Sequence, residues 1–360
     1  MLVPRKGMCR RKRIRMSSKR NIALDITKIV AVLAVAMIHV GGIFVSSYER
    51  GSAEFMWGNI MDSISRIGVP MFVMASGALM LDENKNVSMK KLLSHNVSNI
   101  FLLALFWCAF YAVCFEIVIP HMRGEAVVLQ DAFFTFINGY YHLWYLFMVI
   151  GLYLITPFIR SFVRKENKRL VEVFLCIALA TQFTIPVLRE IQTSWEPVNY
   201  IIRYIGKFYL GFFGGYTAYY VLGWYIVHVG IQKKHLLCLL GALSLAATIV
   251  YVQMTGDYDN GYSNYNLFVA LYSAAVFMLI NRKPVVKVSE RTEKIIVSLS
   301  KLTFGVYIIH PLYMEPLKRV LVYKGVFIGI FVFFALVTVL AFVTCLAGSK
   351  VPGIRKLFRN

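Results

Sequence analysis

Long apolar runs separated by short polar connections make up most of the chain. Each run is close to the ~20 residues that a helix needs to cross ~30 Å of hydrocarbon. The pattern therefore predicts an all-α, polytopic membrane protein with about ten transmembrane helices. The expected spans are 22–46, 60–81, 97–119, 143–160, 170–188, 208–229, 236–254, 264–281, 296–316 and 325–347.

The composition supports this interpretation. Hydrophobic residues make up 58% of the chain and charged residues 16%, whereas soluble domains carry about 45–50% and roughly 25%. A formal net charge of +21 is also found in nucleic-acid-binding proteins, but the basic residues here fall in short blocks between apolar runs, as in cytoplasmic loops of membrane proteins. The six cysteines show no ligand spacing, so neither a disulfide framework nor a metal site is expected.

The distribution of Lys and Arg predicts the orientation. One side of the ten-span arrangement carries 28 of these residues and the other carries eight, which places both termini in the cytoplasm of a cell (plasma) membrane protein. The chain is then a basic cytoplasmic tail (1–20), a membrane-embedded domain (21–348) and a second cytoplasmic tail (349–360). The basic run in the first tail either contacts anionic membrane lipid or only sets the topology. No cleaved signal peptide is expected.

Ionisable residues inside the first span are the first candidates for function, because a charge there costs at least ~2.5–3.5 kcal/mol without a partner or a role. Lys28 and His39 lie eleven residues apart. They therefore share one helix face, about 16.5 Å apart along the axis. Asp25 precedes Lys28 by one turn and can pair with it. The spacing suits a long ligand with an anionic head at Lys28 and a reactive end at His39; alternatively, Asp25 and Lys28 are interfacial and extend toward water.

More polar groups are expected at the depth of His39. Asp62 and Arg66 are four residues apart in the second span, either as a structural pair or as part of a site. His142 opens the fourth span, either in that site or in an interfacial aromatic belt beside Trp144 and Tyr145. An amphipathic cavity open to the outer face would accommodate them all. The remaining members of the group are Glu116, Tyr307 and His310.

Four segments in order resemble the acyltransferase-3 family of integral membrane O-acyltransferases. RNIALDITKIVAVLAVAMIHV (20–40) is similar to the family's opening helix, in which ten positions separate a basic residue from a histidine. SRIGVPMFVMASGALML (65–81) and HLWYLFMVIGLYLITPFIR (142–160) resemble its second and fourth helices. SKLTFGVYIIHPLY (300–313) resembles its late Tyr-x-x-His-Pro segment.

The resemblance implies transfer of an acetyl or related acyl group, such as succinyl, from acyl-CoA to a hydroxyl of a cell-surface carbohydrate or its precursor. Acetyl-CoA is then the donor, His39 the catalytic residue and Lys28 a donor-binding residue. Many relatives carry an arginine pair before the third helix, where this chain reads KKLLSHNVSNIF (90–101). Lys90 and Lys91, with His95, are the candidates to replace those phosphate contacts.

The residue chemistry is consistent with acyl transfer. A thioester has a good leaving group, so the reaction mainly needs a base for the acceptor hydroxyl and a donor or cation for the oxyanion. Histidine suits the first task and Arg66 the second, with Tyr307 and His310 as acceptor contacts. A covalent acyl relay through His39 or Ser76 is an alternative to direct transfer.

The competing hypothesis is a secondary transporter or exporter of a polar small molecule or glycan precursor. Such a protein would also place charged residues inside its spans. It should show a repeat between its two halves, and none is visible in the sequence.

The predicted orientation can be tested with single cysteines introduced near Lys165, Lys287 and Asp257. Impermeant thiol reagents should reach the first two sites only from the cytoplasm and the third only from outside. Labelling beside Asp257 from the cytoplasmic side would overturn the ten-span arrangement.

Overall fold

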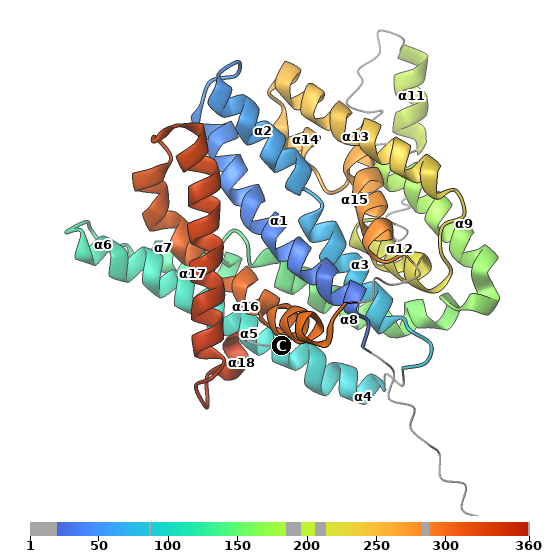
Figure 1. The fold of residues 1–360 in the computed structure, drawn as a ribbon, viewed down its shortest axis with the longest axis horizontal. Coiled ribbons are helices and arrows are strands. Elements are labelled where there is room, and N and C mark those ends of the chain that lie inside the picture. Colours follow the sequence, from blue (N-terminus) through green and yellow to red (C-terminus); the bar gives the residue numbers. More distant parts are fainter. Residues whose placement is uncertain (1–19, 86–87, 185–195, 206–213, 283–287, 359–360) are drawn as a thin grey trace, which may run out of the picture.

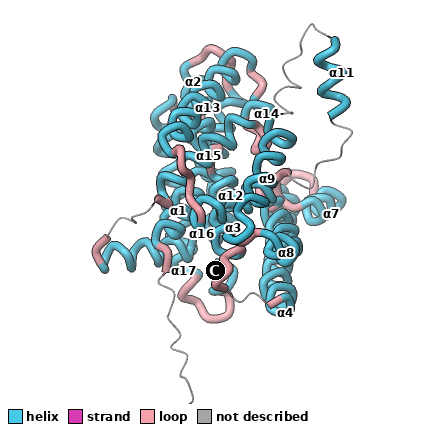
Figure 2. The backbone as a smooth tube through the Cα atoms, turned by 90° about the vertical axis from the view of Figure 1, so that its right-hand side faces the viewer, coloured by secondary structure: helices cyan, strands magenta, loops and turns pink. Residues whose placement is uncertain are grey.

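The computed structural model describes residues 20–85, 88–184, 196–205, 214–282 and 288–358, nearly all of them helical (Figures 1 and 2). No strand occurs in these ranges, so the predicted all-α class is confirmed. The α-helices are α1 (Ile22–Ser47), α2 (Ala53–Ser65), α3 (Gly68–Met80), α4 (Met89–Lys91), α5 (Ser98–Val113), α6 (Ile119–Met122), α7 (Leu129–Asn138), α8 (Trp144–Phe162), α9 (Lys168–Ala178), α11 (Glu196–Ile205), α12 (Tyr216–His228), α13 (Lys234–Thr255), α14 (Tyr258–Gly261), α15 (Leu267–Ile280), α16 (Glu290–Leu321), α17 (Phe333–Gly348) and α18 (Arg355–Phe358).

Short π-helical and 3-10 turns join some of these helices. They continue the helical path of their neighbours, so that α4 to α6, for example, form one long rod. These turns are η1 (Leu92–Val97), η2 (Cys114–Val118), η3 (Lys165–Asn167), η4 (Leu179–Thr184) and η7 (Phe327–Val332).

Helix covers most of the described residues of each expected span, although the second is interrupted between α2 and α3 and the described part of the sixth is helical only over α12. Seven continuous helices in those residues are long and apolar enough to cross a membrane, and α15 is a shorter apolar helix. The expected spans 170–188 and 208–229 include residues 185–188 and 208–213, which lie outside the described residues. A multi-pass membrane protein is therefore supported. The seven continuous candidates are Ile22–Ser47, Ala53–Met80, Met89–Met122, Trp144–Phe162, Lys234–Thr255, Glu290–Leu321 and Phe327–Gly348.

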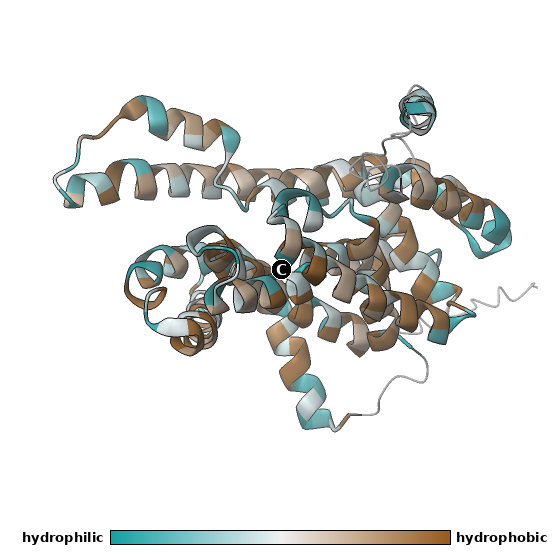
Figure 3. Cartoon of the chain, turned by 90° about the horizontal axis from the view of Figure 1, so that it is seen from above, coloured by the Kyte–Doolittle hydropathy of each residue, from teal (hydrophilic) through white to brown (hydrophobic). Residues whose placement is uncertain are grey.

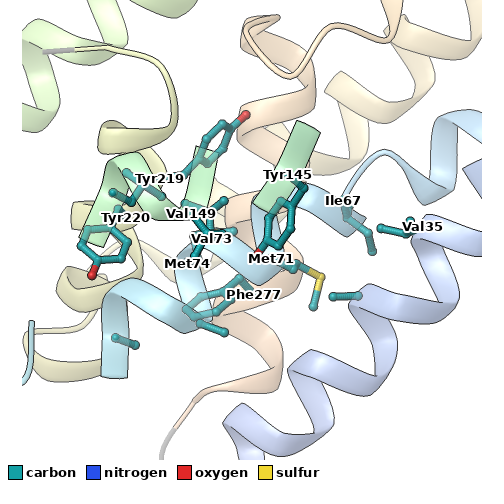
Figure 4. Packing of buried hydrophobic residues seen from close by; sticks show 14 of the residues in the cluster. Val35, Ile67, Met71, Val73, Met74, Tyr145, Val149, Tyr219, Tyr220 and Phe277 are labelled. Carbon is teal, nitrogen blue, oxygen red and sulfur yellow. The ribbon is translucent and has the colours of Figure 1, made fainter. Parts of the chain in front are cut away.

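Helix α1 is the central element of the bundle. It packs against α2, α3, α15, α16 and α17, and its first turn is capped by the Asn21 side chain, which accepts from the Ala23 N–H. Buried apolar residues from α1, α3, α8, α12 and α15 meet in the main core (Figure 4). Many large apolar side chains are instead exposed, as expected for surfaces in contact with lipid.

Two parts of the fold were not predicted. Helix α7 folds back along α5 and η2 (Figures 1 and 3), within a segment expected to be a plain connection. At the C-terminus, α18 contacts α16 and α17, and Phe358 lies over Gly305 and Gly348. Residues 1–19 of the expected N-terminal tail lie outside the described residues.

Helices α3 and α12 pack unusually closely because each presents a glycine to the backbone of the other. A Cβ at Gly77 would overlap the Tyr220 carbonyl, and a Cβ at Gly223 would overlap the Met74 carbonyl. Small residues allow this close approach in membrane proteins. The same contact places α3 between α12 and α1.

Gly77→Ala and Gly223→Ala should therefore each lower the free energy of unfolding, by about 1–3 kcal/mol, because the added methyl forces the helices apart. Gly151→Ala is the matched control, since an added Cβ there has no neighbour within 4 Å. Thermal unfolding in detergent provides the measurement. Equal melting temperatures for all three variants would contradict the close packing.

Candidate functional site

A cavity of about 440 Å³ opens at the end of the bundle where α1 begins. Its mouth carries three cationic side chains, Arg20, Lys28 and Lys301. Toward the membrane interior, the lining becomes mainly apolar and aromatic and ends at Tyr307. The remaining lining residues are Asn21, Leu24, Asp25, Phe72, Ser76, Leu79, Met80, Ile100, Tyr145, Leu146, Val149, Tyr153, Ser300, Thr303 and Phe304.

Lys28 is not the ion-pair partner of Asp25. The Asp25 carboxylate accepts two hydrogen bonds from the Arg20 guanidinium, at 2.6 and 2.8 Å, and one from the Ser300 hydroxyl at 2.6 Å. No ion pair involves Lys28 within the described ranges. The half-buried Lys28 ammonium therefore faces the cavity and can meet an anionic ligand.

A second cavity, of about 360 Å³, lies around the outer half of α1. It includes His39 and Arg66, two residues expected to share a site. Its other polar members are Ser46, Tyr141, Glu315 and Lys318, and the remaining lining residues are Ile38, Gly42, Ile43 and Met314.

Three histidines, from α1, the turn before α8 and α16, meet beside this second cavity, whose lining includes His39. The His39 ring stacks on the His310 ring, with centroids 5.2 Å apart, and the Tyr141 ring meets His39 edge-on at 5.0 Å. His142 meets His310 edge-on at 5.5 Å. His142 is buried at 2% exposure, so it belongs to this cluster rather than to an exposed aromatic belt.

Backbone hydrogen bonds hold the histidine cluster. His310 Nδ1 lies 2.7 Å from the Tyr307 carbonyl oxygen, and His142 Nε2 lies 2.9 Å from that of Ile308. Since a carbonyl only accepts, these ring nitrogens carry the protons. His310 Nε2 and His142 Nδ1 are then acceptors, and both are buried without a hydrogen-bond partner among the described residues.

Tyr307 lies between the two cavities. It lines the first cavity, and its hydroxyl donates to the carbonyl of His142. Its ring lies 5.6 Å from that of His142, while His310, one turn later, stacks on His39 in the second cavity. A thin layer of Tyr307 and the histidine cluster thus separates the two cavities.

Arg66 is both a structural partner and a cavity residue. Its Nε and Nη2 atoms lie 2.7 Å from the two carboxylate oxygens of Asp62, which is fully buried. Its guanidinium carbon lies 4.3 Å from the centre of the Tyr262 ring. These contacts fix the guanidinium at the break between α2 and α3, where it reaches the second cavity.

Four predicted site residues are not part of either cavity lining, namely His310, which contacts the His39 ring, and Glu116, Lys90 and Lys91. Glu116 accepts a hydrogen bond of 3.0 Å from Thr135 on α7. Lys90 and Lys91 are exposed on the short α4. Their proposed contacts with acceptor and donor stay predictions.

Several cavity residues were not predicted. Glu315 and Lys318 follow His310 in α16, and Tyr140 donates a 3.3 Å hydrogen bond to Glu315 from the connection before α8. Burial, with the nearby Glu315 carboxylate, raises the pKa of Tyr140, which keeps its phenol a donor. Glu315 lies one turn beyond the Tyr-x-x-His-Pro segment, and this position was the available signal.

Residues 21–349 match the family model of the acyltransferase-3 acyltransferase domain. Because the match covers nearly the whole chain, the chain belongs to the acyltransferase-3 family, and the predicted resemblance is confirmed. It is a membrane acyltransferase. No curated protein and no solved structure matches the chain.

Proposed function

We propose that this acyltransferase moves an acetyl or related acyl group from acyl-CoA to a hydroxyl of a cell-surface carbohydrate or its precursor. The observation that carries the proposal is the pair of cavities at the two ends of α1, which meet at Tyr307 and the histidine cluster. Two cavities with one dividing layer suit a reaction in which donor and acceptor arrive from opposite sides. We infer a plasma-membrane location with both termini cytoplasmic.

The first cavity suits the donor. Lys28 and Lys301, together with Arg20, offer positive charge to the phosphates of CoA, and the apolar interior suits the pantetheine arm. The distance of about 16.5 Å along α1 from Lys28 to His39 requires an extended donor, which CoA is. Lys90 and Lys91 are further phosphate contacts in this proposal if CoA extends along the same face.

The second cavity suits a polar acceptor. His39 takes the proton of the acceptor hydroxyl, whose oxygen attacks the thioester carbon. The tetrahedral oxyanion then collapses, the C–S bond breaks, and the CoA thiolate takes the proton from His39. Arg66 stabilises the negative charge that develops, while Tyr307 and His310 contact the reacting groups.

His39→Ala should reduce acyl transfer by about 10²–10⁴-fold, the contribution of a general base. His228→Ala is the matched control, because His228 bonds the Ala78 carbonyl and lines neither cavity. Release of free CoA from acetyl-CoA, with cell-envelope carbohydrate as acceptor, measures the rate. An active, folded His39→Ala enzyme would remove the general-base assignment.

Lys28→Ala should weaken CoA binding about tenfold or more through loss of a charge-assisted hydrogen bond, whereas His39→Ala should leave it nearly unchanged. The remaining affinity should depend less on salt, since one screened contact is gone. Calorimetry of CoA binding measures both effects, with Lys165→Ala as an exposed control outside the cavity. Wild-type affinity and salt dependence in Lys28→Ala would place the donor elsewhere.

A further inference from the structure

A third cavity of about 340 Å³ lies away from both site cavities. It is a groove between α9–η4 and α13, with α12 and α15 as its floor, and these helices lie together at one side of the molecule (Figure 1). We call it the lateral groove. Its lining is Leu175, Cys176, Ala178, Leu179, Phe183, Ala218, Tyr219, Leu222, Ile231, Lys233, Leu236, Leu237, Leu240, Ala270, Leu271 and Ala274.

The lateral groove has the chemistry of a lipid chain site. All but one of its residues are uncharged and most are aliphatic, so nothing in the lining would hold water in the hydrocarbon of a bilayer. Tyr219 does not offer its hydroxyl to a ligand, because it donates to the Asn264 carbonyl at 2.7 Å. An apolar occupant is required. The volume of the groove lies within the range of ordinary ligand sites.

Lys233 is the one charged residue of the lining. It precedes α13 and is followed by Lys234 and His235, all three exposed. This connection lies at the same end of the bundle as Arg20, because His228 at the end of α12 bonds the Ala78 carbonyl of α3 at 3.0 Å, and neighbouring residues of α3 line the first cavity with Arg20. Lys233 is therefore at a membrane boundary.

We propose that an anionic phospholipid occupies the lateral groove, with one acyl chain along α13 and its phosphate on Lys233. Basic residues at the cytoplasmic mouth of a cleft between transmembrane helices attract anionic head groups. The groove differs from general annular contact, because it offers an acyl chain contacts with four helices and a cation at one end.

The bound lipid supports the wall of the first cavity. Helix α12, in the floor of the groove, presents Tyr219 to the groove. On other faces of α12, Gly223 packs on Met74 of α3, and the Tyr220 hydroxyl lies 2.9 Å from the Thr156 hydroxyl on α8. Helices α3 and α8 both line the first cavity. A chain in the groove fills the space behind α12 and keeps it against these two helices.

The test uses phosphatidylglycerol and phosphatidylcholine with the same diazirine-bearing acyl chain, reconstituted separately with the full-length protein. After photolysis, mass spectrometry locates the crosslinks. Phosphatidylglycerol should label residues 175–179 and 236–240 more strongly than phosphatidylcholine. Lys233→Ala should reduce the phosphatidylglycerol labelling about fivefold, the factor expected for one lysine near a phosphate.

Lys294→Ala is the control, since this exposed lysine on α16 lies outside the groove, and it should label like wild type. Leu237→Trp, which fills the groove, should reduce labelling by both lipids. A monodisperse elution profile confirms that each variant is folded. Equal labelling by the two lipids, crosslinks located elsewhere, or a dimer that buries the groove against a second copy would each overturn the proposal.

Discussion

A polar side chain inside a bilayer must either find a partner or face a cavity, because lipid offers it no hydrogen bonds. This constraint separates the ionisable residues of the chain into two groups. Asp25 and Asp62 are each held by an arginine, and His142 by a backbone carbonyl. Lys28 and His39 instead lie in cavities at opposite ends of α1. Lys28 and His39, which have no ion-pair partner among the described residues, are the two to which we assign the main contacts with donor and acceptor.

Helix α1 can present both residues only because the surrounding helices hold it in place. Helices α2 and α3 flank it on one side and α16 on another, and α3 is fixed in turn by its close glycine contact with α12. Helix α16 brings Tyr307 and His310 to the level where the two cavities approach each other. Four rings, those of Tyr307, His39, His142 and His310, make up the dividing layer.

Sequence reasoning predicted what depends on local helix geometry. The common face of Lys28 and His39 follows from eleven residues in one helix, and the structure places them in two cavities along it. Sequence reasoning did not predict that Arg20 and Ser300 would hydrogen-bond to the Asp25 carboxylate, because Arg20 precedes the helix and Ser300 comes from α16. Nor did it predict that α7 would turn back and place Thr135 against Glu116. Long-range packing, which a helical period does not encode, decides such contacts.

The most direct test of two cavities meeting at one catalytic layer is a cryo-electron microscopy structure with a non-reactive thioether analogue of acetyl-CoA. Nucleotide density is expected beside Arg20, Lys28 and Lys301, with the pantetheine arm running along the first cavity to end at Tyr307. An analogue bound with its acyl end remote from Tyr307, or bound through the second cavity, would contradict the proposed meeting of donor and acceptor at this layer.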